Sequence, residues 1–209
     1  ERRLGALVLE STELDRPGPE ALQAGLLNAV RRKGLDSLPW TESARQFQAR
    51  VALLRSLWPE DWPALDDDTL TATLDDWLAP WLAGMTRWRD LAALDLVAVL
   101  SNRLGHDRSS KLNKLAPTHL TLPTGRRARL DYRTENPPTL RVKLQAMFGC
   151  RRTPTVACGR VPIQLHLLSP ADRPLAVTAD LTSFWDNAYP QVRKDMRGRY
   201  PKHDWPENP

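Results

Sequence analysis

The chain has 209 residues, of which 41% are hydrophobic and 26% are charged, a composition typical of a soluble globular protein with one large or two small domains. No apolar run approaches the roughly 18 residues that span a bilayer, and the first residues lack the features of a secretory signal. These patterns argue against membrane insertion and secretion, and we expect a cytoplasmic protein.

Charge is divided unevenly along the chain. Residues 1–100 hold 11 Lys and Arg against 16 Asp and Glu, a net charge of −5, whereas residues 101–209 hold 19 against 9, a net charge of +10. Lys and Arg release condensed counterions when they neutralise phosphates, which favours a polyanionic partner for the basic half. A basic surface that is merely solvated would have the same composition.

The first predicted elements are a short strand and a series of helices. The apolar residues 4–9 predict a buried strand, either on its own or joined to a later sheet. The helices that follow are predicted over residues 20–33, 41–58, 66–80 and 90–104. Each ends at a glycine or a proline, as helices commonly do. Amphipathic helices with short links are typical of a compact bundle, which we place within residues 11–116.

From about residue 117 the apolar side chains recur with a period of two, which indicates strands. Residues 120–122 and 128–132 flank a Pro-Thr-Gly turn and predict a hairpin. Residues 140–144 and 161–167 predict further strands, so that the segment forms either a small sheet or a barrel.

The sequence of the C-terminal segment predicts a helix followed by a tail. Asp180 can cap a helix that restarts at Pro190 and continues to Arg197, and the recurring prolines after Gly198 predict an extended tail. The predicted fold class is therefore α+β. Residues 1–116 hold the opening strand and the helical bundle, and residues 117–209 hold the β-rich unit with its C-terminal helix and basic-aromatic tail.

Catalytic motifs are absent from the sequence. It contains no G-x-x-x-x-G-K-[ST] loop for nucleotide phosphates, no G-x-S-x-G elbow and no H-E-x-x-H metal motif. Cys150 and Cys158 lack the spacing of a zinc site, and we expect both to be free thiols. We therefore predict no catalytic residue, no metal and no cofactor for this chain.

Basic residues near aromatic ones are the positive candidates for a functional site. Cations that hold phosphates, beside rings that stack on bases, are the combination used to bind single-stranded nucleic acid. Clustered arginines at a hairpin tip are also suited to phosphate contact, although they could equally be solubilising charges, and the tail aromatics could simply pin the tail to the domain. The candidate nucleic-acid-binding residues are Arg126, Arg127, Arg129, Arg193, Lys194, Arg197, Arg199, Tyr200, Lys202 and His203.

Several strings spread over almost the whole chain resemble one known family. They resemble the C-terminal region of HrpB-type bacterial DEAH-box ATP-dependent RNA helicases. The strings are GLDSLPW at 34–40, APTH at 116–119, LLSPA at 167–171, RP at 173–174, DLTSFW at 180–185, VRK at 192–194 and GRYPKHDWP at 198–206.

This resemblance implies an accessory module of a helicase and not a hydrolase in its own right. In that family the two RecA-like domains and the DEAH motif lie upstream, so ATP and Mg²⁺ are expected only in that core. The implied partners are the upstream helicase core and single-stranded RNA, without a membrane. Two functions stay open: assistance in RNA binding, or a protein-docking module that buttresses the core without touching RNA.

Overall fold

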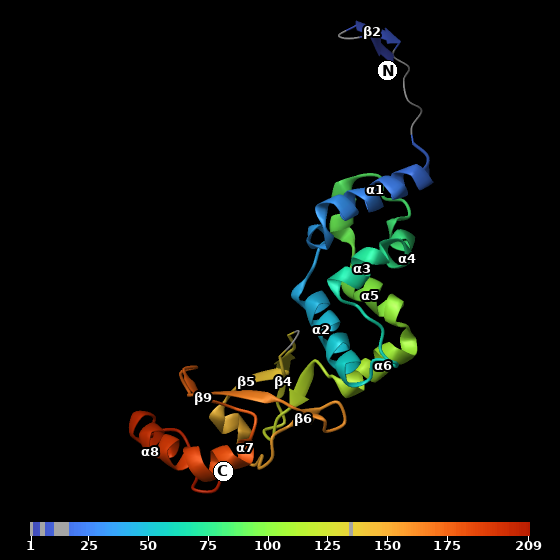
Figure 1. Cartoon of the computed structure of the whole chain (residues 1–209). Helices are drawn as coiled ribbons and strands as arrows, with labels where there is room; N and C mark the ends of the chain where they lie inside the picture. The colour runs from blue at the N-terminus through green and yellow to red at the C-terminus, as the bar shows by residue number, and fades with distance from the viewer. Residues whose placement is uncertain (1, 5–6, 11–16, 134–135) are drawn as a thin grey trace. The chain divides into compact units, whose positions relative to one another are not determined.

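The computed structural model describes residues 2–4, 7–10, 17–133 and 136–209 (Figure 1). The chain divides into two compact units, which we describe separately. The helical unit comprises Glu1–Thr41 and Asp67–Arg103, and the sheet unit comprises Glu42–Asp66 and Leu104–Pro209. Helices together with a mixed sheet confirm the predicted α+β class, whereas the domain boundary after residue 116 stays a prediction.

The helical unit begins with a strand pair. Strands β1 and β2 pair with each other antiparallel in a two-stranded sheet, in place of the single strand predicted over residues 4–9, of which residues 5 and 6 lie outside the described residues. The remaining elements are helices that bury a set of leucines. The elements are β1 (Arg2–Leu4), β2 (Leu7–Glu10), α1 (Pro19–Lys33), η1 (Leu35–Ser37), α3 (Asp67–Ala72), α4 (Leu74–Leu78), η2 (Ala79–Leu82), η3 (Trp88–Ala93) and α5 (Leu96–Leu104).

Polar side chains decide where these helices begin and end. Helix α1 closes as predicted, because Gly34 takes a φ of +84° and its N–H donates to the carbonyl of Val30. The predicted continuous helix over residues 90–104 is wrong. Asp95 breaks it, since its carboxylate accepts from the N–H groups of Val97 and Ala98 and starts α5 afresh.

The predicted helix over residues 66–80 is also interrupted. Thr73 leaves the helical conformation between α3 and α4, and its hydroxyl donates to the carbonyl of Thr69 at 2.8 Å. Threonine hydroxyls compete with the helical backbone in this way. The apolar side chains on either side nevertheless reach the same core, because Leu70 and Leu74 are both fully buried.

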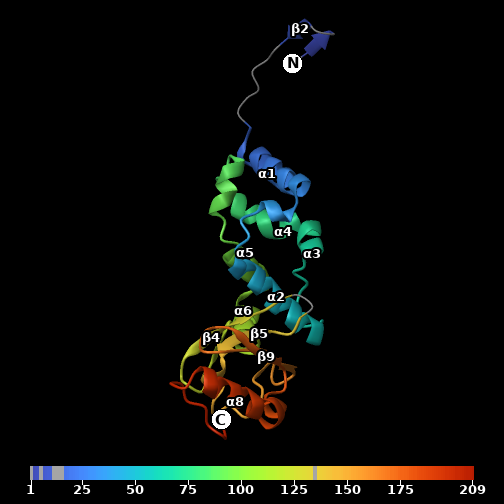
Figure 2. The ribbon, with the colours of Figure 1, turned by 90° about the vertical axis from the view of Figure 1, so that its left-hand side faces the viewer.

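The sheet unit combines two helices, a mixed sheet and a terminal helix (Figure 2). Its helix α6 was not predicted, because Gly105, with a φ of +86°, was interpreted only as a stop and also starts the next helix. The elements are α2 (Glu42–Leu57), α6 (His106–Leu115), β3 (His119–Thr121), β4 (Arg127–Asp131), β5 (Thr139–Lys143), η4 (Leu144–Met147), β6 (Thr155–Val156), β7 (Val161–Pro162), β8 (Gln164–Leu168), β9 (Pro174–Thr178), α7 (Leu181–Ser183), the π-turn η5 (Phe184–Ala188) and α8 (Tyr189–Arg199).

The main sheet has the strand order β3-β4-β5-β8-β9 and is open, with β3 and β9 at its edges. Strands β5 and β8 pair in parallel, and the other neighbours pair antiparallel. The barrel alternative is therefore wrong. One face of the sheet forms the core of the unit, and its buried side chains are Leu130, Leu140, Val142, Leu165 and Leu167.

Helix α2 holds the first hairpin of the sheet in place. Arg50 is only 4% exposed and donates to the carbonyl of Ala116 at 2.5 Å and to the side chain of Asn113 at 2.7 Å. Burial lowers its pKa from the ordinary value. One turn earlier, Gln46 accepts from the N–H of Tyr132 and donates to the carboxylate of Asp131. These contacts connect α2 to both ends of the β3–β4 hairpin.

The C-terminal helix begins as predicted. Asp180 caps it, because its carboxylate accepts from the N–H of Ser183 at 3.0 Å. The helix continues through the short π-helix η5 into α8 and ends at Arg199, two residues beyond the predicted end. Gly198 is therefore helical, and the tail after Tyr200 is not simply extended as predicted, because it starts with a turn in which the N–H of His203 donates to the carbonyl of Tyr200 at 3.1 Å.

Candidate nucleic-acid interface

The face of the sheet that points away from the core is basic. Successive side chains of a strand point to opposite faces, so the residues between the buried leucines share this open face. The register brings Arg129 opposite His119 and Arg141 opposite His166. We call Arg127, Arg129, Arg141, Lys143 and His166 the basic sheet face.

A groove runs over part of this face. Its volume is about 790 Å³, and Arg129, Arg133, Arg141, Gln164 and His166 line it, together with the carboxylates of Glu42 and Asp131. The strands β4, β5 and β8 therefore contribute side chains to one hollow, with donors from guanidinium, amide and imidazole groups. Such a hollow offers several donors to an anionic ligand, beside the two carboxylates.

The cations of this face differ in how they are paired. Arg129 contacts Glu42 at 2.9 Å and Lys143 contacts Asp172 at 3.6 Å, in both cases between exposed side chains. Exposed ion pairs contribute little and are readily exchanged. Arg127 and Arg141 are exposed and have no ion pair within the described residues. These two guanidinium groups are the most available for a phosphate.

The first group of predicted residues, Arg126, Arg127 and Arg129, does not lie together at the hairpin tip. Only Arg126 lies beside the turn, where its carbonyl accepts from the N–H of Leu122 at 2.8 Å and closes the hairpin. Arg127 and Arg129 belong to strand β4 itself and point onto the open face. The prediction that all three share the hairpin tip is wrong, because the turn ends at Gly125.

The second group of predicted residues lies between Arg193 and His203, on α8 and the tail. One of them, Arg193, is held by hydrogen bonds within the fold. Arg193 donates to the carbonyl of Trp205 at 2.8 Å and to the carboxylate of Glu207 at 3.0 Å. Trp205 is only 5% exposed, and its indole N–H donates to the carbonyl of Tyr200. The tail is thus pinned to the unit. Four exposed cations and one exposed imidazole remain at this place: Lys194, Arg197, Arg199, Lys202 and His203.

The two predicted groups lie on different elements, the first on the β3–β4 hairpin and the second on α8 and the tail. Within the described residues, no hydrogen bond, ion pair or ring contact links β4 arginines to α8 cations. The only ring contact in the tail group is between Tyr200 and His203, whose centroids are 6.1 Å apart.

The predicted site residues did not include Arg141, Lys143 and His166 of the basic sheet face. The signal was nevertheless available. Since Leu140 and Val142 were predicted to point inward, the alternation of the strand places Arg141 and Lys143 outward. What could not be seen was that β5 lies beside β4, because strand order depends on long-range pairing.

Other functional sites find no support in the described part of the chain. It contains no group of three or more His, Cys, Asp or Glu residues placed to hold a metal ion. Cys150 and Cys158 are both free thiols, as predicted. None of the described helices combines the length and the apolar character that a membrane crossing requires.

Comparison with known proteins places the chain in a family. The family described as ATP-dependent helicase C-terminal, which is that of HrpB, matches residues 77–209. The chain belongs to the HrpB C-terminal family. The resemblance inferred from the sequence strings is therefore confirmed, and the HrpB assignment covers more than the sheet unit, since the match begins inside α4.

The relatives extend the similarity over the whole chain. It is 44% identical over 208 residues to the ATP-dependent RNA helicase HrpB of Escherichia coli (strain K12), covering 99% of this chain and 26% of that protein. A crystal structure of the E. coli DExH-box NTPase HrpB matches 96% of this chain and 25% of its own with a TM-score of 0.90 at 44% identity. A crystal structure of the E. coli DEAH/RHA helicase HrpB matches with a TM-score of 0.79 at 42% identity, again over 96% of this chain and 26% of its own. The chain thus spans about a quarter of the length of these HrpB proteins.

Proposed function

We propose that this chain is the accessory region of an ATP-dependent RNA helicase and that its basic sheet face holds single-stranded RNA for the motor. In this proposal ATP and Mg²⁺ are bound by a helicase core outside the chain, and the region itself hydrolyses nothing. The observation that carries the proposal is the open face on which Arg127 and Arg141 are exposed and, among the residues that the structure describes, have no carboxylate partner.

The charge of the sheet unit supports RNA over an uncharged partner. The unit contains 21 Lys and Arg against 13 Asp and Glu, a net charge of +8, and the sheet gathers part of the excess on one face. Contacts to phosphates require no particular base, so the expected binding is weak, salt-dependent and without strong sequence preference.

Fluorescence anisotropy with a labelled single-stranded RNA across a salt series tests the proposal. Each phosphate contact to a single strand contributes about 0.7 to the slope of log K against log salt. The double variant Arg127→Ala, Arg141→Ala is therefore expected to bind more weakly, with a slope shallower by about 1.4.

A matched control removes the same charge elsewhere. The double variant Lys194→Ala, Arg197→Ala eliminates two exposed cations of α8 and should keep the wild-type slope. If the α8 variant loses the slope and the sheet variant keeps it, RNA is held at α8 and the assignment to the sheet face fails. If the wild type does not bind at low salt, the chain alone does not hold RNA.

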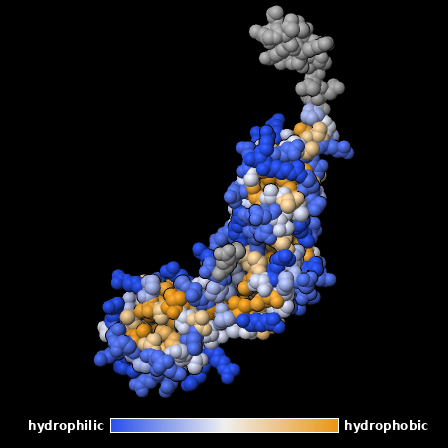
Figure 3. Space-filling view, viewed as in Figure 1, coloured by the Kyte–Doolittle hydropathy of each residue, from blue (hydrophilic) through white to orange (hydrophobic). Residues whose placement is uncertain are grey.

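A second candidate function, docking on the helicase core, is favoured by a separate observation. Figure 3 shows hydrophobic surface where Figure 1 places β9, and Val177 of that edge strand is 57% exposed. Exposed apolar patches and open strand edges are common places of protein contact. Absence of RNA binding combined with loss of core association in Val177→Lys would favour this function.

A further inference from the structure

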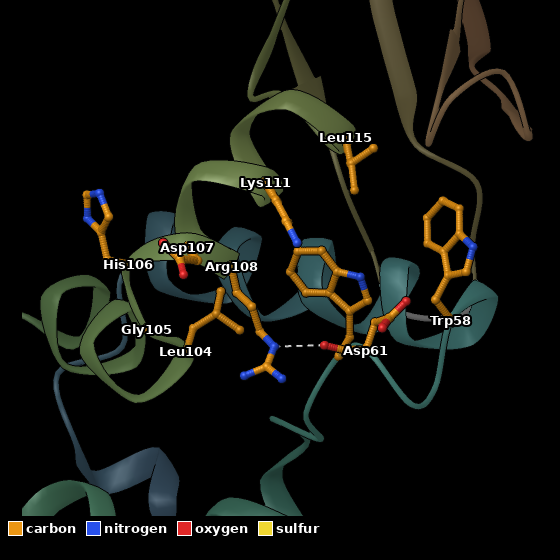
Figure 4. A pocket seen from close by; sticks show the side chains of 10 residues that line it. Trp58, Asp61, Leu104, Gly105, His106, Asp107, Arg108, Lys111 and Leu115 are labelled. Atoms are coloured by element: carbon orange, nitrogen blue, oxygen red, sulfur yellow. Dashed lines mark hydrogen bonds between the residues drawn. The ribbon is translucent and has the colours of Figure 1, made fainter.

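A second hollow lies in the sheet unit, away from the basic sheet face, where the end of α2 meets the start of α6. Its volume is about 660 Å³, which is within the range of about 300–1,000 Å³ common for small-molecule sites. Figure 4 shows Lys111 reaching from α6 toward the middle of the hollow, with Trp58 on its far side. Side chains that matter for its chemistry are Trp58, Asp61, Arg108 and Lys111.

Arg108 and Lys111, the two cations of the hollow, form no ion pair among the described residues. The guanidinium of Arg108 donates through Nε to the carbonyl of Asp61 at 2.8 Å, which leaves its terminal nitrogens available. Lys111 is exposed and, within the described residues, makes no ion pair or hydrogen bond. The hollow also includes the first turn of α6, whose N-cap Gly105 offers no side chain to the backbone N–H groups. An anion would satisfy these donors.

The hollow is not a simple anion site, because Asp61 and Asp107 also line it. A bare phosphate would meet two carboxylates as well as two cations. A ligand that carries its own hydrogen-bond donors beside the anion would satisfy both kinds of group. Purine and cytosine bases have such donors in their amino groups.

Trp58 supplies a surface for stacking. Its ring is half-buried, and its indole N–H has no hydrogen-bond partner within the described residues. The guanidinium of Arg160 lies over this ring at 5.1 Å from the centroid, and Arg160 does not line the hollow. The Trp58 ring therefore borders the hollow and contacts a planar cation, and an aromatic ring with a guanidinium on one face can take a base on the other.

We propose that this hollow binds a nucleoside monophosphate unit, free or as part of a single strand, with the base on Trp58 and the phosphate on Lys111 and Arg108. The site is distinct from the basic sheet face and does not depend on it. A strand bound on that face and a nucleotide bound here are separable events.

Indole-labelled NMR together with calorimetry tests the proposal on the whole chain, with AMP, adenosine and ribose 5-phosphate as probes. AMP is expected to shift the Trp58 indole signal and to bind more tightly than either of the other two. Trp58→Ala should weaken AMP binding roughly five- to 150-fold, as expected for the loss of one stacked base, whereas Trp58→Phe should retain most of the affinity. Lys111→Ala should weaken AMP binding about fivefold or more but leave adenosine unchanged.

Two controls keep the outcome decisive. Lys114→Ala removes an exposed lysine of the same helix that does not line the hollow, and AMP affinity should not change. The variant Arg127→Ala, Arg141→Ala should bind AMP as the wild type does, even if it no longer holds RNA. Ribose 5-phosphate binding as tightly as AMP would overturn the stacking site. So would the absence of any Trp58 shift with both AMP and a short single-stranded RNA. A Trp58 shift with the RNA alone would identify a nucleotide of a strand as the ligand.

Discussion

The helical unit and the sheet unit use their charged side chains in different ways. The helical unit contains 9 Lys and Arg against 12 Asp and Glu, a net charge of −3, whereas the sheet unit has a net charge of +8. In the helical unit several cations have partners nearby: Arg31 pairs with Asp75, Arg103 donates to Thr73, and Lys33 lies 5.0 Å from the centroid of the Trp88 ring.

In the sheet unit, arginine side chains have three separate roles. Arg50 is buried and binds backbone carbonyls, and Arg193 fastens the tail. Arg127 is exposed and has no carboxylate partner in the described part of the chain. The comparison shows that an excess of positive charge is not itself a binding site. Only the cations that the fold leaves unpaired are available to an external anion, and substitutions should separate the three roles.

The largest effect is expected at Arg50, the most buried of these cations. Arg50→Ala would remove the donor to the carbonyl of Ala116 and to the side chain of Asn113, whereas the carbonyl of Leu112 keeps the N–H of Ala116 as its donor. Each buried group left unsatisfied costs about 1–3 kcal/mol, so we expect the free energy of unfolding to fall by about 3 kcal/mol or more. Urea unfolding of the variant measures this loss.

Arg152→Ala is the control for that measurement. Arg152 is exposed and is also an arginine of the sheet unit, and its removal should change the free energy of unfolding by no more than about 0.5 kcal/mol. Equal losses in the two variants would mean that the buried and exposed arginines do not differ in role, and the comparison would fail.

Local patterns in the sequence predicted much of this fold, and long-range pairing explains what was missed. Helix α1 and the β3–β4 hairpin follow from periodicity and from glycines in turns. The two roles of Gly105 and the open sheet could not be inferred locally. The open sheet depends on β9, whose residues alternate weakly and which is defined by its pairing with β8.

The candidate site was predictable to a similar degree. Arg127 and Arg129 were recognisable as a cluster, but Arg141 joins them only because β5 pairs with β4. The structural role of Arg193 could not be predicted from the sequence. It is adjacent to Lys194 in sequence and equally basic, yet the fold directs it to the carbonyl of Trp205. Composition cannot distinguish a cation that is engaged from one that is free.

A smaller effect is expected at Arg193. Arg193→Ala removes the donors to the Trp205 carbonyl and to Glu207 and should destabilise the docked tail by about 1–3 kcal/mol. Hydrogen exchange should then become faster in residues 200–209, while amides in β5 and β8 stay protected. Lys194→Ala, at the exposed neighbouring position, should leave exchange in the tail unchanged. Identical exchange in the two variants would contradict a fastening role for Arg193.

The smallest effect is expected in the helical unit, where an exposed carboxylate caps η3. Asp90 accepts from the N–H groups of Thr86 at 3.0 Å and Arg87 at 2.9 Å, and these two hydrogen bonds hold the pKa of Asp90 below its ordinary value of 3.8. A depressed pKa means that the charged form stabilises the folded state. The contribution is therefore present above pH 3.8 and is lost as the pH falls through the lower folded pKa. Wild type should have a slightly higher Tm than Asp90→Asn at neutral pH, and the difference should vanish in acid. A difference in Tm that is independent of pH would show that the cap acts through its shape and not through its charge.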